Sequence, residues 1–270
     1  CGGSEKETVW LSHENIWAGD KIETNSDGFR EKTELLRKMW LEGKLDTLDD
    51  TATGLVQGSV YRIKSLEYAG KLCIDLGEGA ASDYSRTLTL NTGVMDVSFR
   101  KGGCLITEQA FSSYSYEATC VQYTFSKPYN ITFKLERENL SEPEWKDNIL
   151  FYTGKTQFGE HSFTVGVKIL TDGSTEFTGD CVSVKNATSV QLFISITTEF
   201  DFGGDHPQTA ADILSECCDY KEIYDNHIED FSALFERSEI DLKEDEALGK
   251  LTLPQRLDRL KKDPAAKDPG

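Results

Sequence analysis

The stretch LSHENIWAG, residues 11–19, places three side chains that could contact a ligand within five positions: His13, Glu14 and Trp17. A tryptophan face is the usual platform for the apolar side of a sugar ring, and a carboxylate beside it can bind two hydroxyl groups. The competing interpretation is structural, because a tryptophan that closes the end of a β-sandwich is ordinary. Residue types and spacing alone leave both interpretations open and favour the structural one.

No other group of residue types indicates a particular chemistry. The 47 acidic residues show neither metal-ligand spacing nor a distinctive acid–base pair. No Gly-x-Ser-x-Gly elbow occurs, and the four histidines are scattered. His227 has the apolar neighbours of a helix-packing histidine. His206 lies in FGGDHPQ, expected to be a loop, which lacks the Gly-Lys-Ser/Thr of a phosphate cradle. The sequence therefore predicts no metal site and no cofactor, and it singles out no catalytic residue.

The charge of the chain excludes two classes of partner. Its 29 basic and 47 acidic residues give a formal net charge of -18 that is spread along the sequence. Such a surface repels phosphate backbones and anionic lipid, so nucleic acid and membrane surfaces are not expected partners. Neutral ligands such as sugars are unaffected by the sign of this charge. No run of about 18 apolar residues exists, so no membrane-spanning helix is expected.

Seven cysteines form no C-x-x-C pair, which argues against a zinc site. Most of them replace an apolar residue in a strand-like run, where a free thiol behaves as a small hydrophobe. We therefore expect mainly reduced core cysteines, which favour a cytoplasmic setting. Three glycosylation sequons, at Asn130, Asn139 and Asn186, would matter only in a secreted protein, and the compartment stays open.

Apolar and polar residues alternate repeatedly between residues 58 and 200, which predicts strands with one face in a core. The clearest cases are Leu72/Ile74/Leu76, Val121/Tyr123/Phe125, Ile131/Phe133/Leu135, Phe163/Val165/Val167/Ile169 and Val190/Leu192/Ile194/Ile196. Turns are expected at residues 77–79, 101–103, 171–173 and 185–186. Many short strands without long helices between them are typical of an antiparallel sandwich.

Two helical segments interrupt this pattern. Asp27 can cap a helix over about residues 27–43, with Gly43 as its stop. Apolar residues at three- and four-residue steps predict a longer helix from Thr209 to about Phe235. The composition changes after Leu242, where a charged stretch ending in two Asp-Pro pairs is typical of a linker that leads to another domain.

Six stretches, read in order, form a further pattern: VWLSHENIWAGD (9–20), LLRKMWLEGKLDTLDD (35–50), AGKLCIDLG (69–77), DYSRTLTLNTGVMDVSF (83–99), FSSY (111–114) and HIEDFSALFERSEIDL (227–242). Together they resemble the N-terminal domain of glycoside hydrolase family 95, the α-L-fucosidase and α-L-galactosidase family. The first resembles that family's strand followed by Leu-Asn-Glu-Asp-Thr-Leu-Trp-Ser-Gly. A seventh stretch, LPQRLDRLKKDPAAKDPG (253–270), resembles that family's lead-in to its helical barrel, so that the ordered series covers nearly the whole chain.

The resemblance implies a mainly β chain. An antiparallel β-supersandwich with a short N-terminal helix would occupy residues 1–205, and a C-terminal helical linker, residues 206–270, would lead to an (α/α)6 catalytic barrel. Hydrolysis in that family is inverting, and its acid and its water-activating residues lie in the barrel, so no catalytic residue is expected in this chain. His13, Glu14 and Trp17 would lie at the sandwich edge facing the barrel, as substrate-binding or domain-interface residues.

The function implied is that of a non-catalytic domain that helps to shape the active site of the barrel. The barrel would be its intramolecular partner, and α-L-fucosylated or related glycans the substrates of the whole enzyme. Departures from the family pattern, at residues 12–14, at Lys71 and at Glu108, leave the sugar open. The alternatives are a free-standing carbohydrate-binding module with Trp17 as its platform, and a structural interaction module.

Overall fold

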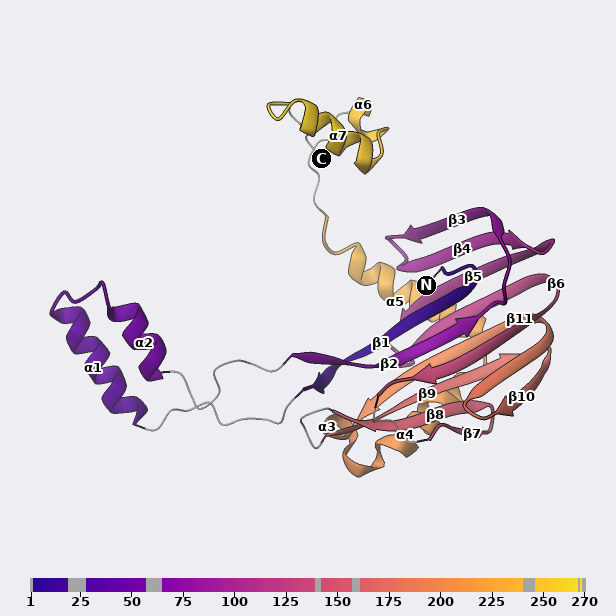
Figure 1. The fold of residues 1–270 in the computed structure, drawn as a ribbon, viewed down its shortest axis with the longest axis horizontal. Coiled ribbons are helices and arrows are strands. Elements are labelled where there is room, and N and C mark those ends of the chain that lie inside the picture. The colour runs from indigo at the N-terminus through magenta and orange to yellow at the C-terminus, as the bar shows by residue number, and fades with distance from the viewer. Residues whose placement is uncertain are drawn as a thin grey trace.

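The computed structural model describes residues 2–18, 28–56, 65–138, 142–156, 161–239, 246–266 and 268. Over these residues eleven strands form one curved sheet, and every strand pairing is antiparallel (Figure 1). The strands are β1 (Lys6–Trp17), β2 (Leu66–Asp75), β3 (Ala81–Thr89), β4 (Val94–Lys101), β5 (Cys104–Ser113), β6 (Ala118–Glu136), β7 (Glu144–Lys146), β8 (Ile149–Lys155), β9 (Ser162–Thr171), β10 (Ser174–Thr178) and β11 (Cys181–Thr198). The predicted mainly β, antiparallel class is confirmed.

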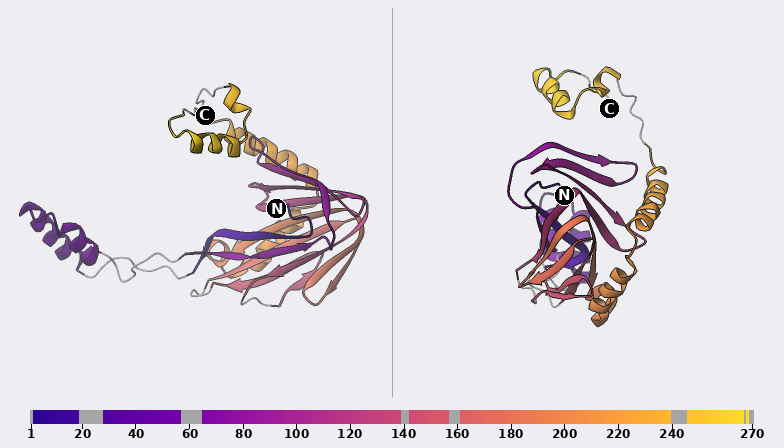
Figure 2. Two further views of the ribbon diagram at one scale, coloured as in Figure 1. Left: turned by 45° about the horizontal axis from the view of Figure 1, so that its top comes forward. Right: turned by 90° about the vertical axis from the view of Figure 1, so that its right-hand side faces the viewer.

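The sheet folds back on itself because two long strands, β6 and β11, each serve two layers. Residues 118–125 of β6 pair with β5, whereas residues 132–136 pair with β2. The first residues of β11 pair with β10, and its last nine pair with β9. A larger layer ordered β3-β4-β5-β6-β11-β9-β8-β7 therefore faces a smaller one built on β1, β2 and β10 (Figure 2). This is the predicted sandwich.

The main core lies between the two layers. The strand residues predicted to face inward are buried there, including Leu72 and Ile74 of β2 and Val121 and Tyr123 of β6. The layers approach closely at Gly70, where a Cβ atom would lie 2.0 Å from the Tyr152 hydroxyl oxygen. That hydroxyl donates a hydrogen bond to a backbone carbonyl of β2, so the close contact of the layers requires glycine at this position.

Two sequence predictions in this region were wrong in the same way. The alternating runs at residues 121–125 and 131–135 belong to one strand, β6, and the turn predicted at Lys185 and Asn186 lies inside β11. The pairing of β11 with β6 shifts register between Val184 and Ser189, and Asn186 has a positive φ of 56°. A polar residue in this conformation ends a strand or makes a bulge, and here it bends the strand between the two layers.

Helices cover the outer face of the larger layer (Figure 2). After β11 come α3 (Glu199–Phe202), a short 3-10 turn η1 (Gly203–Asp205), α4 (His206–Glu216) and α5 (Tyr220–Phe235). The predicted loop around His206 is thus helical, and the predicted single helix from residue 209 is two, because Asp219 caps a new helix by accepting hydrogen bonds from the Lys221 and Glu222 amides. Leu214, Tyr220 and Ile223 form a second apolar cluster with the sheet.

Four helices lie elsewhere in the chain: α1 (Phe29–Leu41), α2 (Leu48–Val56), α6 (Glu246–Gly249) and α7 (Leu253–Lys262). The predicted first helix and its stop at Gly43, which has a positive φ of 71°, are confirmed, whereas Asp27 lies outside the described residues. Within the described ranges, none of the helices has the length and apolar content needed to span a membrane.

Candidate functional site

A groove of about 710 Å³ lies along β1, where this strand meets the turn between β5 and β6 and the start of α3. Its walls come from four elements that are far apart in the sequence. They are residues 9–14 of β1, residues 112–119 around the β5–β6 turn, Ile194 and Ile196 of β11, and Asp201 and Phe202 of α3. This is the place where the sequence predicted a functional or interface site.

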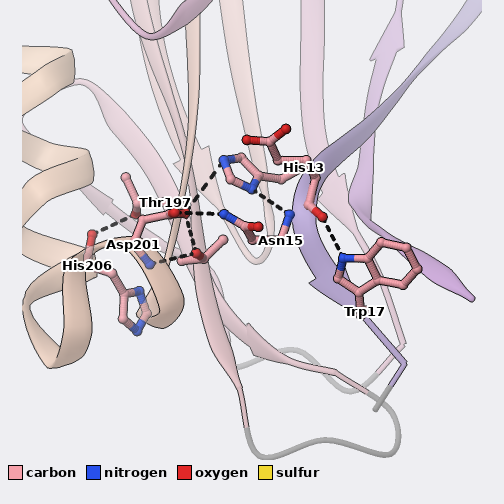
Figure 3. A network of polar contacts seen from close by, with 8 residues as sticks. His13, Asn15, Trp17, Thr197, Asp201 and His206 are labelled. Atoms are coloured by element: carbon pink, nitrogen blue, oxygen red, sulfur yellow. Dashed lines mark hydrogen bonds and ion pairs between the residues drawn. The ribbon is translucent and has the colours of Figure 1, made fainter. Parts of the chain in front are cut away.

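A polar network fixes the β1 side of the groove (Figure 3). The Asn15 side-chain amide donates to Asp201 Oδ1 at 2.7 Å, and His13 Nε2 lies 3.9 Å from Asp201 Oδ2. The Asn15 backbone N–H points to His13 Nδ1 at 3.2 Å, so Nδ1 is an acceptor and the proton of the neutral ring lies on Nε2, toward Asp201. Thr198 also donates to Asp201, at 2.6 Å, which holds the carboxylate in place. The network therefore orients His13 at the groove wall.

The structure brings His13 and Glu14 together but sets Trp17 apart. His13 and Glu14 both line the groove, and Trp17 does not. The Trp17 indole N–H donates to the Glu14 carbonyl at 2.7 Å, which folds the ring back along the end of β1 (Figure 3). The ring is 39% exposed, so it is neither a core residue nor a free platform.

Sequence reasoning missed Asn15 and Asp201, which complete the network, and Tyr114 and Phe202, which give the groove two exposed aromatic rings. Asn15 stood inside the opening motif and carried the only available signal. Asp201 lies 186 residues further along the chain, so no spacing could have joined the two.

Ser162 and His206, the first residue of α4, form a serine–histidine pair, but their protons are not arranged to activate the serine as a nucleophile. Ser162 Oγ lies 2.9 Å from His206 Nε2, but it donates its own proton to Glu199 at 2.8 Å. His206 Nε2 must then be the donor, and its Nδ1 accepts from Thr164 at 3.0 Å. Burial lowers the pKa of His206, and the hydrogen bonds from Ser162 lower the pKa of Glu199. This cluster is a satisfied structural network.

His227 is also structural, as predicted. Its Nε2 lies 2.8 Å from the Thr92 carbonyl, and its ring stacks on Phe111 at 4.7 Å between centroids. Within the described ranges, no group of three or more His, Cys, Asp or Glu residues is arranged to hold a metal ion. Six described cysteines are free thiols, and three of them, Cys104, Cys120 and Cys217, are buried, in line with the predicted core role.

A second buried polar cluster lies between the layers. Glu7 of β1 accepts hydrogen bonds from the Tyr123 hydroxyl at 2.9 Å and from the Gly2 amide at 2.6 Å. Glu108 of β5 is buried nearby, and within the described ranges neither of its carboxylate oxygens has a hydrogen-bond partner. Burial, and secondarily the charge of Glu7, raise the pKa of Glu108 to about 8. Two carboxyl groups in one core thus favour a protonated Glu108 at neutral pH.

The chain was compared with curated protein sequences, solved structures and protein families. No curated protein sequence matches the chain. One similar solved structure is titled "Putative kojibiose phosphorylase from human microbiome"; the identity is 14% and the TM-score 0.46, over 63% of this chain and 26% of that one. The chain thus spans about a quarter of the length of that protein.

Residues 1–202 match the family described as glycosyl hydrolase family 65, N-terminal domain. This match confirms the predicted glycoside hydrolase N-terminal domain at a coarser level than family 95. It covers β1 to α3 and therefore includes every wall of the groove. The chain belongs to the glycosyl hydrolase family 65 N-terminal domain family.

Proposed function

We propose that this chain is the non-catalytic sandwich domain of a glycoside hydrolase that acts on α-L-fucosides or related α-L-sugars, and that it packs against an (α/α)6 catalytic barrel of the same polypeptide. The family match supports a glycoside hydrolase. The ordered series of motifs supports the α-L-sugar class, through their resemblance to family 95.

The composition of the groove is the observation that favours a non-catalytic, positioning role for this domain. Its fixed polar group, His13–Asn15–Asp201, is a hydrogen-bonding arrangement in which each side chain holds another in place. Such a group orients a ligand or a neighbouring surface, whereas hydrolysis of a glycosidic bond requires an acid and a base on opposite faces of a sugar. We therefore assign positioning to the groove and the chemistry to the barrel.

The exposed side chains of the groove favour contact with the barrel edge together with its substrate. Tyr114 is 90% exposed in the β5–β6 turn, and Phe202 of α3, which also lines the groove, is 38% exposed. Exposed aromatic rings together with the Glu14 carboxylate in one groove suit a partly polar surface that includes sugar hydroxyls.

The first test is incubation of the purified 270-residue chain with 2′-fucosyllactose. We expect no free fucose, and release of fucose by the rigorously purified chain would overturn the non-catalytic assignment. An antibody raised to this chain then isolates the native polypeptide from its source cells. A polypeptide far larger than 30.2 kDa that releases fucose would support the proposal. A large polypeptide that releases glucose from maltose but no fucose would contradict the α-L-sugar class.

The groove itself is tested by His13→Ala and Glu14→Gln in the native-length polypeptide. We expect a higher KM with a smaller change in kcat, because the groove positions substrate without reacting with it. Trp17→Phe is the matched control, since Trp17 is on the same strand but outside the groove. Unchanged kinetics in both groove variants would contradict the positioning role.

A further inference from the structure

A second candidate ligand site lies on the outward face of the smaller layer. Trp10 of β1, Lys71 of β2 and Glu136 of β6 form one row across three neighbouring strands. Trp10 is 63% exposed, although tryptophan is a residue that folding normally covers. Its ring meets the Tyr68 ring edge to face at 5.3 Å, and Lys71 Nζ lies 5.2 Å from its centroid. These two contacts fix the orientation of an exposed aromatic platform.

A cavity of about 380 Å³ adjoins this platform. It shares Tyr68 and Lys71 with the Trp10 contacts, and its other polar walls are Lys134, Glu136, Arg137, Glu138 and Asp180. The volume falls in the range of roughly 300–1,000 Å³ that is typical of small-molecule sites. Trp10 also borders the groove along β1, but Tyr68 and Lys134 belong to this cavity alone.

The charges around the cavity alternate in sign. Lys134 Nζ lies 3.1 Å from Glu136 and 3.0 Å from Asp180, so one cation bridges two carboxylates. Hydrogen-bond donors and acceptors therefore stand side by side with little local net charge. A free anion would meet the two carboxylates, whereas a ligand rich in hydroxyl groups can donate to the carboxylates and accept from the lysines.

Arg137 is a rigidly held part of the cavity wall. Its side chain is only 6% exposed and forms an ion pair with Glu67 through Nη2, at 2.5 Å. The guanidinium also lies 4.6 Å from the Phe163 ring centroid, so packing fixes its position. Nη1 is buried and has no hydrogen-bond partner among the described residues, which ordinarily costs about 1–3 kcal/mol. The ion pair and the contacts with the Tyr68 and Phe163 rings therefore hold Arg137 as a rigid part of the cavity wall.

We propose that the Trp10–Arg137 face binds a neutral saccharide, with a pyranose ring on Trp10 and its hydroxyl groups directed toward Lys71, Lys134 and Glu136. An exposed ring beside paired donors and acceptors is the combination that recognises a sugar with one apolar face and several hydroxyl groups. This site would hold glycan at the surface of the domain. It goes beyond the proposed function, because it needs no contribution from a catalytic barrel.

The test is isothermal titration calorimetry of the 270-residue chain with maltose, cellobiose and 2′-fucosyllactose. We expect binding of at least one of them with a Kd of about 1 mM, the affinity of a shallow open site. Trp10→Ala and Tyr68→Ala should each weaken this binding by tenfold or more. Trp17→Ala is the matched control and should leave it unchanged, and His13→Ala reports on binding in the groove along β1. Circular dichroism and thermal unfolding establish that each variant is folded.

Two outcomes would overturn the proposal. One is the absence of binding heat for all three sugars up to about 20 mM, well above the expected Kd. The other is binding that His13→Ala abolishes and Tyr68→Ala does not, which would place the sugar in the groove along β1. Neither outcome bears on the fucose-release test, so failure of this site and failure of the proposed function are distinguishable.

Discussion

Two buried polar clusters in this domain are built on opposite principles. Beneath α4, His206 has a partner for each ring nitrogen, in Ser162 and Thr164. Between the sheet layers, Glu7 accepts hydrogen bonds, whereas Glu108 has none for either oxygen from the part of the chain that the structure describes. A satisfied network stabilises one arrangement of the chain, whereas an unsatisfied carboxyl group makes stability depend on protonation. The two clusters should therefore respond to pH with opposite sign.

The largest effect should come from Glu108. Its folded-state pKa is raised from 4.5 to about 8, so folding favours its protonated form. The stabilisation of the fold by protonated Glu108 is therefore fully present below pH 4.5 and is lost as pH rises through about 8. We expect Glu108→Gln to be more stable than the unmodified chain above pH 8, by a few kcal/mol.

Urea denaturation of the two proteins over a pH series checks this prediction. The difference in free energy of unfolding between them should grow from pH 5 to pH 8 and then level off, in keeping with the pKa of about 8. Tyr123 and Glu7 face the same cluster, and both are unchanged in the variant. Parallel pH profiles would contradict a protonated Glu108.

The next effect should come from His206→Ala. The substitution leaves Ser162 and Thr164 without their imidazole partner, and we expect a loss of roughly 2–3 kcal/mol of unfolding free energy at pH 8. Because burial lowers the folded pKa of His206, the native chain should lose stability as pH falls below its ordinary value of 6.5, and the variant should not. Equal acid sensitivity in both proteins would contradict this assignment.

A smaller effect is expected for Tyr123→Phe, which removes one of the hydrogen bonds to Glu7 without changing the shape of the core. A hydrogen bond to a charged carboxylate contributes about 1.5–3 kcal/mol, and we expect a loss near the lower end. The matched control is Tyr129→Phe, since Tyr129 donates to a neutral carbonyl, that of Leu76, at 2.7 Å. If the control variant lost more stability than Tyr123→Phe in thermal or urea unfolding, the charged partner would not matter.

The smallest effect is expected at the exposed end of β1. Trp17→Phe removes the indole hydrogen bond to the Glu14 carbonyl, which is solvent-accessible, so we expect a loss of about 0.5–1 kcal/mol. Urea denaturation of Trp17→Phe, alongside His206→Ala and Tyr123→Phe, measures this loss of unfolding free energy. A loss as large as that of His206→Ala would mean that Trp17 has a structural role that its exposure does not indicate.

Sequence patterns predicted the strands well because burial on one face imposes a period of two on each of them. The residues of β2, β6, β9 and β11 that were expected to face inward do so. Boundaries were predicted less well where one strand crosses between layers. The polar residues in the middle of β6 and β11 look like turns in the sequence, yet they are the exposed bends of continuous strands.

The candidate groove could be predicted only in part. The motif around His13 and Glu14 marked its β1 wall, because residue types that contact ligands were clustered there. Asp201 and Phe202 could not be assigned to it, since local patterns carry no information about which distant segments meet. For the same reason, the sequence could not predict that Trp10 and Arg137 lie on one face of the domain.

The sequence by itself determined the class of the domain: many one-sided strands, free cysteines, an acidic surface and an ordered set of motifs typical of a glycoside hydrolase N-terminal domain. Those properties depend on local periodicity, composition and order, which can be read along the chain. Only the tertiary structure decided that β6 and β11 serve both layers, that Glu108 is buried without a hydrogen-bond partner, and that Trp17 lies outside the groove. The first two depend on pairing between strands that are distant in the sequence, and the third on a hydrogen bond from the Trp17 indole to the Glu14 carbonyl, which residue types do not encode.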